Sequence, residues 1–166
     1  MKKSLPLLLL TLCCSAPIFG QEFSFRDLTK LRTMPYPAFE AQVQQKGYKQ
    51  SDVENNGNCA VFKNGRDVIS YCLPSSDSVD LHGLAIERHP FIRLETADKS
   101  EYDRLKNDIT ATMNYYDTRS FKQRKDHYVE HIYLSDLLSV HLYNVAYHND
   151  ENPCYEIDVY SIYSGY

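Results

Sequence analysis

The stretch that decides the fold is Leu138-Ser139-Val140-His141-Leu142-Tyr143-Asn144-Val145-Ala146-Tyr147. Its first residues alternate between aliphatic side chains and side chains with a polar tip. Successive side chains of a β-strand point to opposite faces of the sheet, so this pattern predicts a half-buried strand. We expect Leu138, Val140 and Leu142 to join the core, and the residues between them to face water.

Two further extended segments flank this strand. Residues 128–134 precede it, and residues 154–163 follow a turn rich in Asn, Asp and Pro. Apolar side chains at alternate positions predict a strand in each segment. Together the three segments predict an antiparallel meander, because short turns join neighbouring antiparallel strands.

The register of the meander follows from the lengths of its two turns. A three-residue turn pairs Leu134 with Leu138, and a six-residue turn pairs Tyr147 with Cys154. Glu130 then falls on the inner, apolar side. One row across the three strands is expected to hold His131, His141 and Tyr160. The water-facing side is expected to carry imidazole, phenol and acid groups, namely His127, His131, Tyr133, His141, Tyr143, Glu156, Asp158 and Tyr160.

Helices are predicted ahead of the strands in both halves of the chain. Asp98 and Glu101 are acids that accept hydrogen bonds from the free amides of a first helical turn. Ser24 with Asp27 gives the same signal, and Pro37 suits the first turn of a second helix. The helix that begins at Asp98 has an apolar stripe made of Tyr102, Leu105, Ile109 and Met113.

The first half also contains a hairpin signal, in which an Asn-Gly pair lies between two runs of strand-forming residues. When Lys63 faces Val68 across this turn, Cys59 lies opposite Cys72. Directly opposite side chains lie within bonding reach, which predicts a disulfide; buried free thiols are the alternative. Cys154 is left over from this pairing.

These elements predict an α+β fold. A helix precedes a β-hairpin and a further strand in the first half, and a helix precedes a three-stranded antiparallel meander in the second. Residues 117–125 are expected to form a polar connection into the meander. We expect a single sheet layer packed on helices.

The N-terminal segment has the features of a secretory signal peptide. Lys2 and Lys3 precede an apolar run, and the small residue Gly20 follows it. We predict that residues 1–20 are removed on export. Residues 21–166 then form a single secreted α+β domain, in the periplasm or the extracellular medium.

Lipid attachment is the alternative fate of this segment. Cys13 or Cys14 occupies the place of a lipid-modified cysteine, but the bulky Leu12 before Cys13 disfavours that modification. The apolar run is shorter than the roughly 20 residues needed to cross a bilayer. We therefore expect cleavage without a membrane span.

The chain is acidic, with 18 Lys and Arg against 22 Asp and Glu and a net charge of −4. Removal of residues 1–20 takes away two lysines and no acid, which makes the net charge −6. Such a chain lacks the cationic charge that supplies most non-specific affinity for nucleic acids, and anionic lipids repel it. We expect no nucleic-acid partner, whereas charge complementarity favours a basic protein.

The sequence contains no Gly-x-Ser-x-Gly elbow, Walker loop, dinucleotide fingerprint or Cys-x-x-Cys pair, so we expect no cofactor and disfavour an enzyme. Residues 127–131 match the zinc-protease pattern His-x-x-Glu-His. That chemistry requires a helix, whereas this segment has the pattern of a strand. The candidate metal ligands are His127, His131 and His141, and we expect no metal.

The chain has 14 tyrosines and no tryptophan, and tyrosine suits half-buried sheet faces and binding surfaces alike. We expect a non-enzymatic recognition module, of inhibitor or immunity type, that binds another protein through the sheet face. Its predicted binding residues are Tyr133, His141, Tyr143, Asp158 and Tyr160. The alternatives are a small exported hydrolase or metal-binding protein that uses the His, Glu and Asp of this face, and a structural envelope protein.

Overall fold

The computed structural model describes residues 22–51, 58–73, 90–123, 126–146 and 154–162. Within these ranges the chain forms three helices and one eight-stranded antiparallel sheet, which confirms the predicted α+β fold. The signal peptide predicted over residues 1–20, with Cys13 and Cys14, lies outside the described residues.

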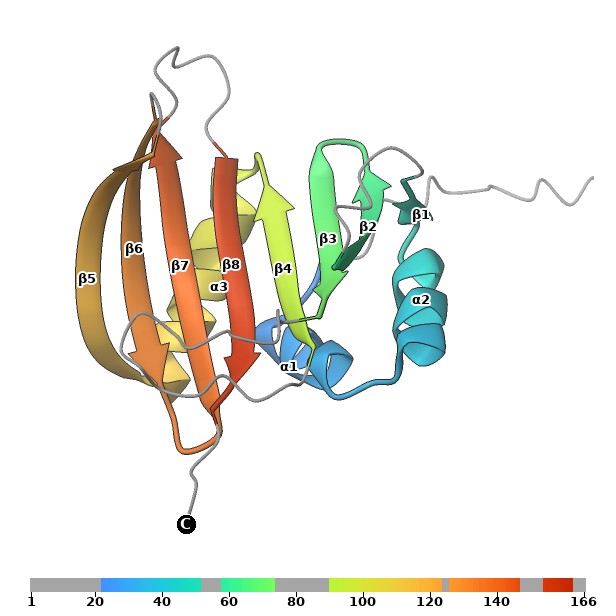
Figure 1. Cartoon of the computed structure of the whole chain (residues 1–166), viewed down its shortest axis with the longest axis horizontal. Helices are drawn as coiled ribbons and strands as arrows, with labels where there is room; N and C mark the ends of the chain where they lie inside the picture. Colours follow the sequence, from blue (N-terminus) through green and yellow to red (C-terminus); the bar gives the residue numbers. More distant parts are fainter. Residues whose placement is uncertain (1–21, 52–57, 74–89, 124–125, 147–153, 163–166) are drawn as a thin grey trace, which may run out of the picture.

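The last strand in the sequence lies inside the sheet. The sheet order is β1-β2-β3-β4-β8-β7-β6-β5, so β8 joins the two halves of the chain (Figure 1). The elements in chain order are α1 (Phe25–Arg32), α2 (Tyr36–Gln45), β1 (Lys49–Gln50), β2 (Cys59–Asn64), β3 (Asp67–Cys72), β4 (Phe91–Thr96), α3 (Lys99–Thr112), β5 (Asn114–Gln123), β6 (Asp126–Leu134), β7 (Leu138–Ala146) and β8 (Cys154–Ser161).

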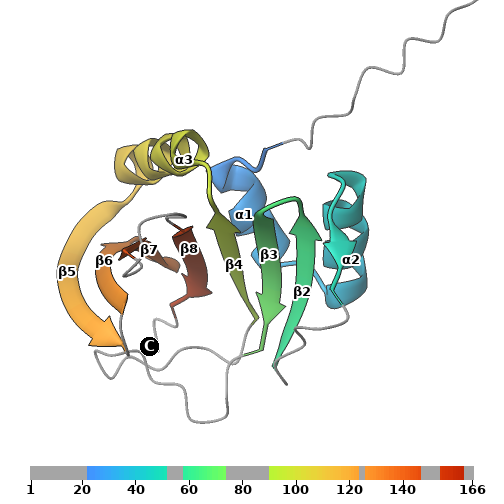
Figure 2. The ribbon, with the colours of Figure 1, turned by 90° about the horizontal axis from the view of Figure 1, so that it is seen from above.

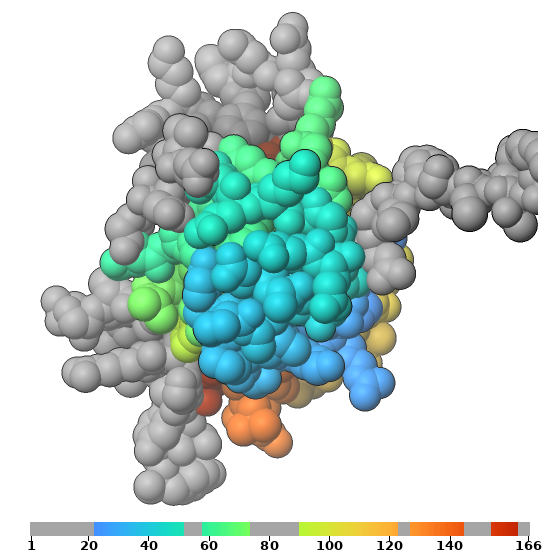
Figure 3. All heavy atoms as spheres, turned by 90° about the vertical axis from the view of Figure 1, so that its right-hand side faces the viewer, coloured from blue at the N-terminus to red at the C-terminus, as the bar shows by residue number. Residues whose placement is uncertain are grey.

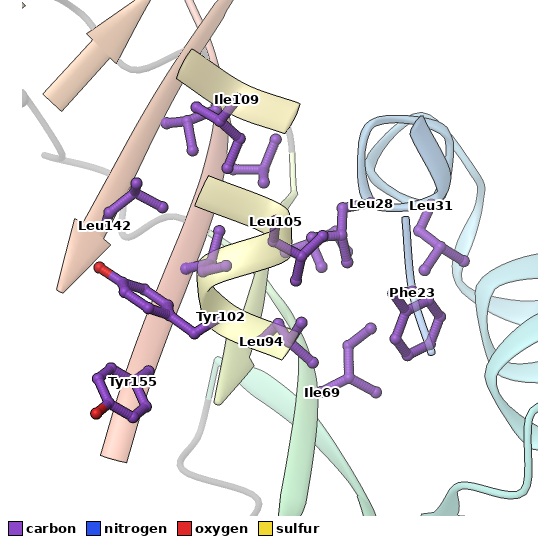
Figure 4. Packing of buried hydrophobic residues seen from close by; sticks show 14 of the residues in the cluster. Phe23, Leu28, Leu31, Ile69, Leu94, Tyr102, Leu105, Ile109, Leu142 and Tyr155 are labelled. Atoms are coloured by element: carbon purple, nitrogen blue, oxygen red, sulfur yellow. The ribbon is translucent and has the colours of Figure 1, made fainter. Parts of the chain in front are cut away.

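The three helices pack against one face of the sheet, which we call the helix face (Figure 2). Fully buried side chains from α1 and α3 meet those of the central strands there (Figure 4). Because apolar burial is the main stabilising term in folding, this layer holds the sheet in its shape. The residues of this core that Figure 4 labels are Phe23, Leu28, Leu31, Ile69, Leu94, Tyr102, Leu105, Ile109, Leu142 and Tyr155.

Helix α2 covers the end of the sheet that carries β1 and β2. The centroid of its Phe39 ring lies 5.6 Å from that of Phe62 and 5.0 Å from that of Tyr71. Both partner rings lie on the helix face. Figure 3 shows α2 and α1 side by side on this end of the molecule. This aromatic packing covers the helix face at this end of the sheet.

The helices begin where the sequence predicts. The Ser24 hydroxyl accepts a hydrogen bond from the Asp27 amide at 3.1 Å, and Asp27 accepts one from the Ser24 amide at 3.0 Å. At α3 the Asp98 carboxylate accepts a hydrogen bond from the Ser100 amide at 2.7 Å. The capping residues fix where each helix begins, and the predicted stripe of α3, which is buried in the core, fixes which face of that helix meets the sheet.

The hairpin of β2 and β3 has the predicted register. Lys63 pairs with Val68, and Cys59 pairs with Cys72 across the ladder. Gly65 in the turn has a φ of +64°, a conformation that glycine adopts without a steric penalty. Cys59 and Cys72 form a disulfide, which confirms the predicted pair.

The predicted polar connection over residues 117–125 is wrong. Residues 114–123 form β5, the edge strand of the sheet, and the meander has four strands in place of three. An edge strand needs one buried face at most and tolerates charge, which is why its polar sequence hides the strand pattern. The register of β5 against β6 shifts between Tyr115 and Asp117, as in a β-bulge.

The predicted register between β6 and β7 is also wrong. Leu134 pairs with Ser139, so four residues lie between the two partners in place of the predicted three. The Ser135 amide donates to the Leu138 carbonyl at 2.9 Å and closes the turn. A shift of one residue sends every side chain of β6 to the opposite face. His131 and Tyr133 therefore lie on the helix face, away from the row predicted to contain them.

Candidate functional site

The face opposite the helices, which we call the polar face, carries a hydrogen-bonded group of polar side chains. They come from four neighbouring strands, β4, β8, β7 and β6, and the ladders bring them together. We call this set the polar cluster: Arg93, Glu130, Ser139, His141, Tyr143, Glu156, Asp158 and Tyr160. Its most buried members are Asp158 at 0%, Glu130 at 1%, Ser139 at 5% and His141 at 7% exposure.

Asp158 is the acceptor for one half of the cluster. Arg93, opposite it on β4, donates from Nε to Oδ1 at 2.9 Å and from Nη2 to Oδ2 at 2.8 Å. The Tyr160 hydroxyl donates to Oδ2 at 2.8 Å. Burial lowers the pKa of Arg93, but the hydrogen bonds and charge of Asp158 outweigh burial and raise it. The pair is therefore ionic and bidentate, the strong form of such a contact.

The two cluster tyrosines are fixed hydrogen-bond donors. Burial, and then the charge of nearby carboxylates such as Asp158, raises the pKa of Tyr143 and of Tyr160 well above the ordinary value. The Tyr160 ring stacks on Phe91 at 4.7 Å and meets His141 edge-on at 4.9 Å. These contacts hold the phenol between the two halves of the cluster.

Glu130, His141 and Ser139 form the second half. His141 Nδ1 lies 2.7 Å from Glu130 Oε1, and His141 Nε2 lies 2.8 Å from the Ser139 hydroxyl oxygen. Burial raises the pKa of Glu130, but hydrogen bonds from His141 and Tyr143 outweigh burial and lower it. Glu130 is thus an ionised acceptor inside the sheet, where a charge is tolerated only when it is paired.

Glu156 is the least compensated acid of the cluster. Its Oε1 lies 3.2 Å from Arg93 Nη2, and 19% of its side chain is exposed. Burial, and then repulsion by Asp158, raises the pKa of Glu156 to about 8 despite the attraction of Arg93. The carboxyl therefore holds a proton at neutral pH.

This proton makes stability depend on pH. In the unfolded chain the carboxyl of Glu156 titrates near its ordinary value of 4.5, so between pH 4.5 and 8 the folded state holds one more proton. Rising pH then lowers the free energy of unfolding, by at most about 1.4 kcal/mol per pH unit. Glu156→Gln is expected to match the wild type near pH 4.5 and to exceed its stability above pH 8. Urea denaturation tests this, and a wild-type-to-variant difference that is constant over this range would contradict it.

Four of the five predicted binding residues lie together on the polar face: His141, Tyr143, Asp158 and Tyr160. Tyr133 does not join them. It is 8% exposed, belongs to the core on the helix face, and has its ring 5.8 Å from Tyr115. The expectation that this face is open to water is also wrong at its centre, because paired polar groups there are buried.

The candidate metal ligands do not converge. His127 and His131 lie on the helix face of β6, whereas His141 lies on the polar face of β7. His131 Nδ1 lies 2.7 Å from the Thr118 hydroxyl, and burial lowers the pKa of His131. Because residues 126–134 form a strand, positions four apart lie about 13 Å apart along it. Among the described residues no group of three or more His, Cys, Asp or Glu side chains is placed to hold a metal ion.

Sequence reasoning placed Ser139 and Glu156 on the correct face without naming them as binding residues, and it missed Arg93 and Glu130. Arg93 comes from a strand 65 residues away from Asp158, and no local pattern relates the two. Glu130 carried a usable signal, since a carboxylate on the apolar side of a predicted strand is a warning that the register is wrong.

A recess adjoins the cluster on the polar face. It has a volume of about 140 Å³ and lies between the disulfide and Arg93. The residues that line it are Cys59, Val61, Val68, Ser70, Cys72, Arg93 and Glu95.

Comparisons with known proteins return no relative: no protein-family model, curated protein or solved structure matches the chain. None of the described helices combines the length and the apolar character needed to cross a membrane. The chemistry of the polar face is therefore the basis for assigning function.

Proposed function

We propose that the protein is an exported recognition module that binds a basic group of a partner protein on its polar face. The observation that carries this proposal is the rigid set of arginine and tyrosine side chains around buried Asp158. Arginine and tyrosine are enriched at the centres of protein interfaces, and side chains already held in place lose little entropy on binding.

Charge selects the kind of partner. Glu156 is repelled by the carboxylates of Asp158, Glu95 and Glu130, while Arg93 attracts it. A lysine or arginine side chain that approaches the exposed part of Glu156 relieves this repulsion and displaces its proton. The recess beside Arg93 offers space for such a side chain. The negative net charge of the chain also favours a basic partner.

Export is part of the proposal. The disulfide between Cys59 and Cys72 is of a kind that persists in oxidising compartments and is rare in the cytosol. The lysines and apolar run of residues 1–20 supply the corresponding export signal. Both features agree with a site of action in the periplasm or the medium.

Binding of a basic peptide tests the proposal. The chain from residue 21 to 166 is titrated calorimetrically with a peptide of alternating lysine and glycine, and with the same peptide after lysine acetylation. We expect binding of the first peptide only. Glu156→Gln is expected to weaken it about tenfold, the equivalent of about 1.4 kcal/mol.

Asp136→Asn is the matched control, because it makes the same acid-to-amide replacement in the exposed turn between β6 and β7. We expect this variant to retain the wild-type affinity. Equal weakening of peptide binding by both variants would show that the binding depends only on the net charge of the protein. Equal binding of the acetylated peptide would exclude recognition of a basic group.

A further inference from the structure

The second half of the polar cluster, which consists of Glu130, His141 and Ser139, has the arrangement of an acid–base relay that ends on a hydroxyl. Ser139 lies 2.8 Å from one nitrogen of His141, and Glu130 lies 2.7 Å from the other. Ser139 and His141 are two residues apart on β7, so their side chains share a face, and the ladder places Glu130 beside them on β6. The two contacts are therefore fixed by the backbone of neighbouring strands.

The charge of Glu130 sets the direction of the relay. Glu130 is an ionised acceptor, so the proton of the imidazole lies on Nδ1 and is donated to Oε1. Nε2 then has a free lone pair and accepts the hydrogen bond from the Ser139 hydroxyl. This is the tautomer that general-base activation of a serine requires.

The surroundings keep the imidazole in this orientation. The Tyr160 ring lies 4.9 Å from the His141 ring in an edge-on contact, and the Tyr143 hydroxyl lies 3.4 Å from His141 Nδ1. His141 is only 7% exposed, so bulk water competes weakly for either ring nitrogen. Preorganised hydrogen bonds in a site of low water content are the usual requirement for activating a hydroxyl.

We propose that Ser139 is an activated nucleophile that accepts acyl groups from small esters, with His141 as general base and Glu130 as the residue that positions His141. The Ser139 oxygen bonds to the acyl carbon, and its proton passes to His141 Nε2. Collapse of the tetrahedral species breaks the ester C–O bond, and the leaving alcohol takes that proton. Water then attacks the acyl-serine in the same way, which releases the acid and restores the hydroxyl.

The position of Ser139 limits the substrate. It is 5% exposed, and it is the second residue of β7, beside the turn in which Leu137 is 68% exposed. A hydroxyl with so little exposed surface favours acyl donors with small groups on both sides of the ester. This inference is independent of the binding of a basic partner.

Covalent labelling tests the proposal. The mature chain is treated with a small fluorophosphonate and with p-nitrophenyl acetate, and the adducts are located by peptide mass spectrometry. We expect one adduct per chain, on Ser139, and none in Ser139→Ala. His141→Gln is expected to lower the labelling rate by about 100-fold or more, the range of general-base assistance. Glu130→Gln is expected to lower it as well, and Glu130→Asp to restore part of it.

Ser161→Ala is the control, because Ser161 is also a buried serine, at 8% exposure on β8, and it lies on the helix face, outside the relay and outside the recess. Its labelling is expected to equal that of the wild type. A folded wild-type protein that acquires no adduct on Ser139 would overturn the proposal without any variant. Labelling spread over exposed serines, or equally fast in a folded His141→Gln protein, would overturn it too.

Discussion

Asp158→Ala is expected to lower the free energy of unfolding by about 3 kcal/mol. Asp158 is fully buried and accepts two hydrogen bonds from Arg93 and one from Tyr160. Its removal leaves the guanidinium and the phenol without their main acceptor. Glu156, 3.2 Å from Arg93, supplies partial compensation once the repulsion by Asp158 is gone.

This compensation can be measured separately. Asp158→Ala combined with Glu156→Gln removes both acids beside Arg93, and we expect a loss of about 5 kcal/mol, more than the sum of the two single effects. Arg93→Met with Asp158→Leu removes the whole ion pair and is expected to recover most of the stability, because apolar side chains of similar volume replace it. Urea denaturation measures each difference. A loss below about 1 kcal/mol for Asp158→Ala would show that the pair contributes little.

Replacement of both Cys59 and Cys72 by alanine is expected to cost about 3 kcal/mol. The disulfide closes a loop with a sequence separation of 13 and joins directly opposed residues of β2 and β3. Its loss enlarges the set of conformations open to the unfolded chain, which is the main source of the effect in the chain-entropy view. Urea denaturation of the variant, and of the wild type with and without reductant, measures this loss of stability.

Cys154→Ala serves as the control, because Cys154 lies outside this disulfide. We expect that variant to unfold within about 1 kcal/mol of the wild type. Three reactive thiols in the denatured, unreduced mature protein would contradict the bridge itself. Equal stability of the wild type and the double variant would contradict its energetic role.

The parts of the fold that depend on local signals were predictable. The cap at Asp98 and the stripe from Tyr102 to Ile109 define α3 within one stretch of chain. The Asn-Gly turn fixes the register of β2 and β3, and therefore the disulfide, because both strands lie next to the turn that pairs them. In these elements the local preference and the tertiary packing agree.

The parts that depend on turn length were not predictable in the same way. One residue more between Leu134 and its partner on β7 moves His131 and Tyr133 to the helix face and brings Glu130 to His141. The pairing of β7 with β8 differs from the prediction by two residues, an even shift, so His141 pairs with Asp158 and the faces of β8 stay as predicted. An odd shift in register moves a side chain to the other face of the sheet and an even shift does not, since side chains alternate with a period of two residues.

The candidate site depends on a third kind of information, which is long-range pairing. Asp158 was predicted on the correct face, but its partner Arg93 lies on β4, in the other half of the chain. Alternation tells which face a side chain meets, and it does not tell which strand becomes its neighbour. The ion pair therefore becomes visible only once the sheet order is known.

The central position of β8 bears on how the sheet folds. Strands β1–β4 and β5–β7 are two groups in which each strand lies beside the next one in the sequence. β8 joins the two groups, because it pairs with β4 on one side and with β7 on the other. Closure of the sheet thus depends on the contact between β4 and β8, in which Arg93 meets a residue 65 positions away, and such distant pairing slows the folding of a sheet.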